Sequence, residues 1–87
     1  MMSSMFYDPQ NPPDPAEWLA LDESERIRLA QNYHVKSRVK LPNVKAHAAF
    51  HAIVENQVAE DFGPTVHALD RLQREGLSRH DAVHAVG

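Results

Sequence analysis

Signals for the start of a helix recur at short intervals along this chain. They are polar capping residues and prolines at first helical positions, and they stand at Asp14-Pro15, Asp22, Asn43, Gly63-Pro64 and Ser78. A capping side chain accepts a hydrogen bond from a backbone N–H of the first turn, and proline has no N–H to lose there. Gly76 is placed to end one of these helices in the left-handed conformation. The sequence therefore predicts an all-α fold, a compact array of four to five short helices.

The first part of the chain follows a different pattern. Residues 1–13 hold three of the six prolines and show no periodic apolar pattern. We predict an extended N-terminal arm over residues 1–13, packed through Met5, Phe6 and Tyr7. The remaining residues, 14–87, are predicted to form a single helical domain.

The predicted core has few large side chains. One Trp and five Phe or Tyr residues are present among 87, so Ala, Val, Leu and Ile must fill most of the interior. Trp18 and Leu19, in the first predicted helix, are expected to be core residues. A core of small side chains buries less apolar area per residue. A bound metal or a partner subunit would therefore add stability to such a chain.

Charge and hydropathy argue against two classes of partner. The formal net charge is −3 and the nine Lys and Arg residues are scattered, so no basic stripe is present to neutralise nucleic-acid phosphates. No apolar run approaches the roughly 18 residues of a membrane span. The start, MMSSMFYDPQ, lacks the basic and apolar regions of a secretory signal, and the chain has no cysteine. We therefore predict a cytoplasmic protein with neither a nucleic-acid nor a membrane partner.

Histidine is the compositional outlier, with six copies in 87 residues. Two pairs have the spacing of one helical turn, His47 with His51 and His80 with His84. Random placement of six histidines would give about 0.3 pairs at this spacing. Side chains four positions apart lie one above the other on a helix, so each pair can offer two imidazoles to one ion.

The first pair lies on or beside the apolar face of its predicted helix, which also carries Phe50 and Val54. An inward imidazole without a hydrogen-bond partner costs on the order of 1–3 kcal/mol. A metal site satisfies both pairs at once. The predicted ligands are His47, His51, His80 and His84, with Glu55 as an optional fifth. Imidazole ligands without thiolates suit a divalent transition metal, zinc before nickel, copper or iron.

Two other interpretations remain open. The histidines can be core residues bonded to carboxylates or backbone carbonyls, in a module for interaction or homodimerisation, and Glu55 can face solvent. Alternatively, His80-Asp81-Ala82-Val83-His84 is a degenerate form of the H-E-x-x-H motif of metal-dependent hydrolases, with Asp for the Glu that acts as general base. The sequence shows no recognisable nucleophile from which a reaction could be assigned. His34, near a helix C-terminus, is expected to be structural, and His67 to be exposed.

Two motifs in this chain resemble those of a known family. They are H-x-x-x-H-x-x-V-E-N-Q, which begins at His47, and R-H-D-A-V-H-A-V-G, which begins at Arg79. The chain resembles, over roughly residues 15–87, a family of small bacterial all-helical proteins that form a domain of unknown function. In that family the second motif usually reads R-H-E-A-I-H-A-I-G, and the chain often continues past the Gly. Asp81 departs from this pattern, which weakens a catalytic role for that position. The resemblance supports the motifs and implies no reaction.

Overall fold

The structure, a computed structural model, describes residues 6–36 and 43–86, and five α-helices lie within these ranges. The bounds are α1 Pro15–Leu19, α2 Glu23–Lys36, α3 Val44–Ala59, α4 Gly63–Arg74 and α5 Arg79–Val86. No β-strand is present in these ranges, where the extended arm makes one isolated bridge between Asp8 and Asn11. The predicted all-α array of short helices is confirmed.

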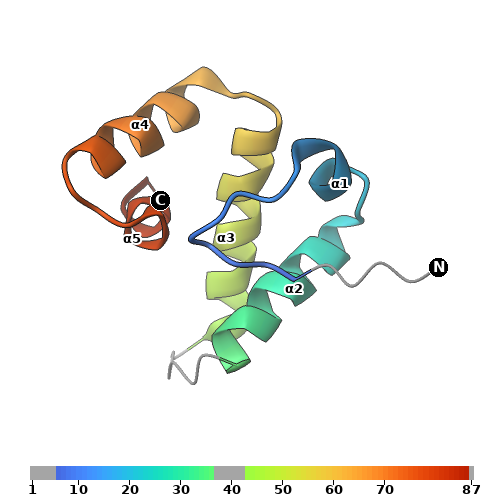
Figure 1. Cartoon of the computed structure of the whole chain (residues 1–87). Helices are drawn as coiled ribbons and strands as arrows, with labels where there is room; N and C mark the ends of the chain where they lie inside the picture. The colour runs from blue at the N-terminus through green and yellow to red at the C-terminus, as the bar shows by residue number, and fades with distance from the viewer. Residues whose placement is uncertain (1–5, 37–42, 87) are drawn as a thin grey trace.

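Helix α3 is the centre of the arrangement and contacts each of the other four helices. In Figure 1, α1 and α2 lie to one side of α3, and α4 and α5 lie to the other. The N-terminal arm loops across α3 toward α5 before the chain turns back into α1 (Figure 1). Residues of α2, α3, α5 and the arm are therefore brought together near the middle of the molecule.

The helix starts follow from local hydrogen bonds. The side chains of Asp14, Asn43 and Ser78 each accept a bond from the backbone N–H three residues later, at 3.1, 3.0 and 3.1 Å. Gly76, with a φ of +106°, follows the end of α4 in the left-handed conformation that glycine adopts without strain. These four positions confirm the predicted boundaries.

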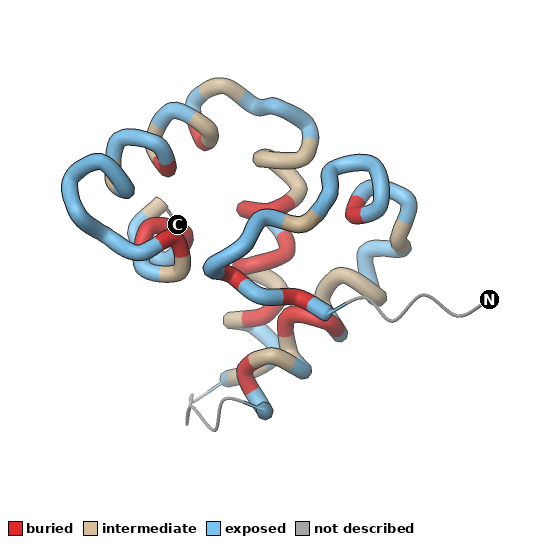
Figure 2. The backbone as a smooth tube through the Cα atoms, viewed as in Figure 1, coloured by how far each residue is buried: buried red, intermediate tan, exposed pale blue. Residues whose placement is uncertain are grey.

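The core consists of two clusters on either side of α3. One joins the arm, α1, α2 and α3 around Trp18 and Leu29, and the other joins α3, α4 and α5 around Val54 and Val83. Buried positions accordingly line α3 and the inner turns of α2 and α5 (Figure 2). The clusters are rich in alanine, which lets the helices approach closely.

Some expected core residues lie elsewhere. Trp18 is fully buried, but Leu19 is 37% exposed, because successive positions on a helix point about 100° apart and this one-turn helix buries one face. In the arm Tyr7 is buried and Phe6 is 72% exposed, while Met5 lies outside the described residues. No helix in the described ranges is long and apolar enough to cross a membrane.

Candidate metal centre

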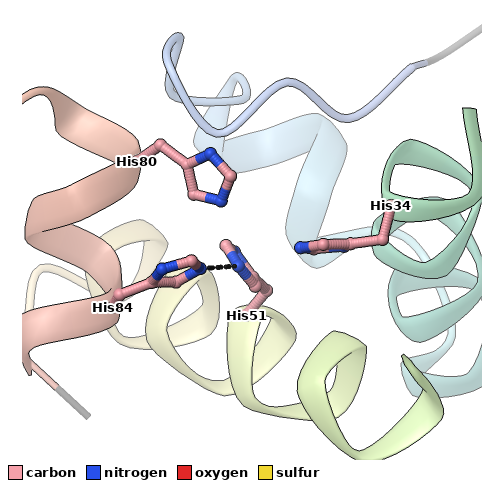
Figure 3. Close-up of side chains that lie close together, drawn as sticks. All are labelled: His34, His51, His80 and His84. Carbon is pink, nitrogen blue, oxygen red and sulfur yellow. Dashed lines mark hydrogen bonds between the residues drawn. The ribbon is translucent and has the colours of Figure 1, made fainter. Parts of the chain in front are cut away.

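Four histidines from three helices converge between the two core clusters. One ring nitrogen from each lies within 4.8 Å of the others, and the residues are His34 of α2, His51 of α3, and His80 and His84 of α5. We call this group the four-histidine cluster. Figure 3 shows the four rings directed toward one another. The group is compatible with the binding of a metal ion.

The cluster is buried at one end and open at the other. His34 and His51 are 1% and 0% exposed, whereas His80 is half-buried and His84 is exposed. His47, one turn before His51, stands at the open end, with its Nε2 3.0 Å from Nε2 of His84. An ion would therefore have protein on one side and a route from solvent on the other.

Nε2 of His84 also lies 3.0 Å from Nε2 of His51, the contact drawn in Figure 3. A neutral imidazole nitrogen carries either a proton or a lone pair. This atom can therefore make one well-formed hydrogen bond, to His47 or to His51, and not two at once. These contacts bring more imidazole nitrogens close together than hydrogen bonds between them can satisfy.

His34 has its tautomer fixed by its own helix. Its Nδ1 lies 2.7 Å from the carbonyl oxygen of Ala30, one turn earlier. Because a carbonyl oxygen can only accept, Nδ1 must carry the proton. The lone pair of His34 is therefore on Nε2, the nitrogen available to a metal ion.

His80 presents an unsatisfied nitrogen. Its Nε2 is buried and has no hydrogen-bond partner among the described residues. The ring is held by edge contacts with Tyr33, at 5.5 Å between centroids, and with His84, at 4.4 Å. A buried nitrogen without a partner is costly, and an ion at the centre of the cluster is one way to satisfy it.

The electrostatics favour the neutral form of His47, His51, His80 and His84. Burial first, and then the charges of neighbouring histidines, lower the pKa of His51 to about 2. Burial and the same repulsion lower the pKa values of His47, His80 and His84. Neutral imidazole is the form that binds metals, so the lowered pKa values keep His51, His80 and His84 in a ligand-competent form near neutral pH.

Behind His51 lies a buried polar network. The Tyr7 hydroxyl is 3.0 Å from Nδ1 of His51 and donates to Oε2 of Glu55 at 2.7 Å. Arg79 donates to both carboxylate oxygens of Glu55 at 2.8 Å. Burial and the adjacent carboxylate raise the pKa of Tyr7, so its hydroxyl keeps its proton. Glu55 is 1% exposed, which corrects the interpretation that it faces solvent.

The structure treats the predicted ligands unequally. It brings His51, His80 and His84 together, places His47 at the open rim, and engages the Glu55 carboxylate with Arg79 and Tyr7. His34, expected to be structural, is part of the cluster. Its position on the inward face of α2 was the available signal, because an inward imidazole needs a partner.

The remaining titratable residues of interest lie outside the cluster. His67 is exposed on α4, as predicted. Asp81 is exposed on α5, where its backbone N–H donates to the Ser78 side chain at 3.1 Å. Neither belongs to the group of side chains that could hold an ion.

Comparison with family models, curated proteins and solved structures finds no match to this chain. The family resemblance of the two histidine motifs therefore stays a prediction. The functional proposal therefore rests on the geometry of the four-histidine cluster.

Proposed function

We propose that this chain is a metal-binding protein whose four-histidine cluster holds one divalent transition-metal ion through the Nε2 atoms. The observation that carries the proposal is the convergence of four imidazoles from three helices, one of which has a buried nitrogen without a hydrogen-bond partner in the described ranges. Such an ion would tie α2, α3 and α5 together, in a protein whose core is built from small residues.

The donor set favours zinc. A Zn–N bond of about 2.0–2.1 Å in a tetrahedral site places the nitrogens about 3.3 Å apart. The nitrogens of His51 and His84 are already 3.0 Å apart, and the whole set lies within 4.8 Å. Small rotations of the side chains would bring the four nitrogens to the tetrahedral spacing. Nickel, copper and iron also accept imidazole ligands, so the experiment must also determine which metal is bound.

Metal content tests the proposal directly. The chain is produced without an affinity tag, and freshly purified protein is assayed by elemental analysis and by titration with Co²⁺, whose visible absorption reports tetrahedral nitrogen ligation. We expect near-stoichiometric zinc, and a tetrahedral Co²⁺ spectrum that saturates at one equivalent. Metal content near zero, with no cobalt spectrum, would overturn the proposal.

Two variants make the test specific. The double substitution His51→Ala with His84→Ala removes ligands from α3 and α5 and should abolish both signals. His67→Ala removes an exposed histidine of α4 that is not in the cluster, and it should bind like the wild type. Equal loss in both variants would indicate nonspecific binding by surface histidines.

The interaction module and the compact hydrolase stay predictions. The first requires a homodimer in solution without metal, which light scattering on metal-free protein would detect. The second requires metal-dependent turnover that Asp81→Asn lowers without loss of the ion. The cluster geometry supports metal binding, which the metal assays above test separately.

A further inference from the structure

We infer that Tyr7 and Glu55 are positioning residues of the metal site, which together fix the tautomer of His51 that presents its Nε2 lone pair to the ion. The inference rests on the proposed function and adds to it two residues that touch no ion. It makes the N-terminal arm, which carries Tyr7, part of the site. We call the chain of contacts from Glu55 through the Tyr7 hydroxyl to His51 the Tyr7–Glu55 relay.

The relay starts from an acceptor that cannot donate. Glu55 is the anionic partner of a buried ion pair, in which the two terminal nitrogens of Arg79 lie 2.8 Å from its two oxygens. This fork is the geometry in which guanidinium binds carboxylate most strongly. Glu55 therefore acts only as an acceptor toward its other partner, Tyr7.

The Tyr7 hydroxyl, in the middle of the relay, has one proton, which can point to only one of its two neighbours. The Tyr7 hydroxyl lies 2.7 Å from Oε2 of Glu55 and 3.0 Å from Nδ1 of His51. Since the carboxylate can only accept, the hydroxyl proton points to Glu55, and the hydroxyl oxygen must accept from His51. Nδ1 of His51 therefore carries the ring proton, which leaves the lone pair on Nε2.

The chosen nitrogen is the one that faces the cluster. Nε2 of His51 lies 3.0 Å from Nε2 of His84, whereas the Tyr7 hydroxyl contacts the other ring nitrogen, Nδ1. A metal-bound histidine typically donates its other N–H to an oxygen that orients the ring and raises its basicity. The backbone carbonyl of Ala30 does this for His34 from within α2, whereas His51 depends on an anionic relay through the arm.

The arm is anchored beside the same histidines. The carbonyl oxygen of Pro9 accepts from Arg79 at 2.9 Å, and the Gln10 side chain accepts from the backbone N–H of His80 at 3.2 Å. Docking of the arm and presentation of His51 are thus linked, and linkage is reciprocal in binding free energy. A bound ion should therefore hold the arm more firmly in place.

The first test reads the tautomer in metal-free protein. Long-range ¹H–¹⁵N correlation spectra at pH 8 distinguish a proton on Nδ1 from one on Nε2. In the wild type we expect His51 to carry its proton on Nδ1, and in Tyr7→Phe we expect a shift of the proton toward Nε2. A wild-type His51 protonated on Nε2 would overturn the inference, whatever any variant does.

The second test reads metal affinity with a matched control. Tyr7→Phe should weaken Zn²⁺ binding about 10–100-fold in a chelator competition, the loss typical for the partner of a ligating histidine. Tyr33→Phe removes a hydroxyl from another ring that packs against cluster histidines, and its affinity should match the wild type. Circular dichroism of both variants checks that the helices are retained.

The outcomes separate the two proposals. A wild-type protein that binds neither Zn²⁺ nor Co²⁺ overturns the proposed function and this inference with it. A wild type that binds, with Tyr7→Phe unchanged in both affinity and tautomer, overturns the inference alone. Equal weakening in Tyr7→Phe and Tyr33→Phe also overturns it, because the effect would then come from packing and not from the relay.

Discussion

Arg79 and Glu55 form a buried ion pair that joins α5 to α3, with two N–H···O bonds of 2.8 Å. Their side chains are 7% and 0% exposed. Burying two charges is costly unless every polar atom finds a partner, and here Tyr7 and the Pro9 carbonyl supply further hydrogen bonds. The pair therefore connects the helix that carries His51 to the helix that carries His80 and His84.

Removing one partner of this pair should destabilise the fold strongly. Glu55→Gln keeps the size of the side chain but leaves the Arg79 guanidinium buried without its anion. We expect a loss of about 3–5 kcal/mol in the free energy of unfolding, as for other broken buried pairs. Urea unfolding followed by circular dichroism measures it.

An exposed pair serves as the control for that measurement. Arg71 of α4 and Glu75, the residue that follows the helix, lie 3.3 Å apart, with side chains 61% and 56% exposed. Glu75→Gln should change the free energy of unfolding by less than about 1 kcal/mol, because solvent already screens the charges. Similar losses for the two substitutions would contradict the role given to burial.

The glycine after α4 offers a test of backbone geometry. Gly76 has a φ of +106°, with open space around the position of an added Cβ. Gly76→Ala should therefore destabilise the protein by about 1 kcal/mol through backbone strain and not through collision. Gly63 also has open space and is the first residue of α4, so Gly63→Ala should be neutral or slightly stabilising. A neutral Gly76→Ala would refute the argument.

Local signals explain why most of the fold could be predicted from sequence. Capping by Asp14, Asn43 and Ser78 involves residues three positions apart, and the left-handed Gly76 acts within one turn. Such interactions are visible in the sequence because their partners are neighbours. The same holds for the histidine pairs, whose spacing of four places them on one helical face.

The site could be predicted only in part, because its closure is tertiary. His34 lies 17 positions before His51 and 46 before His80, so no spacing rule connects them. Tyr7 and Arg79 meet at Glu55 from opposite ends of the chain, and no periodicity indicates this. The optional ligand Glu55 is instead buried in the network behind His51. What escaped prediction was the relative placement of α2, α5 and the arm around α3.

His34 and His47 give the sharpest test of which histidines are ligands. His34 belongs to the four-histidine cluster, whereas His47 lies at the rim against His84. We expect His34→Ala to weaken Zn²⁺ binding by more than the about 10–100-fold that loss of a ligand's hydrogen-bond partner causes. His47→Ala should weaken it much less. Chelator competition measures both, and the reverse order would favour the ligand set predicted from the sequence.

The metal-free protein should lose stability as the pH falls below the pKa of free histidine. The pKa of His51 is lowered to about 2, first by burial, and those of His47, His80 and His84 are lowered as well. Between each folded value and the unfolded value of about 6.5, the unfolded chain binds more protons than the folded one. Stability therefore rises with pH across this window, by up to about 1.4 kcal/mol per pH unit for the buried His51, and by less for the more exposed histidines, whose charges solvent screens.

Urea unfolding in the presence of a chelator, at intervals from pH 8 to pH 5, measures this dependence. We expect a plateau above about pH 7 and a decline below about pH 6.5, where free histidine begins to take up protons. His67→Gln, at an exposed position outside the cluster, should leave the curve unchanged, whereas His51→Gln should flatten it. A wild-type curve that stays level down to pH 5 would mean that the buried imidazoles accept protons in the folded protein as readily as in the unfolded chain. The neutral, ligand-competent form argued for His51, His80 and His84 would then be wrong.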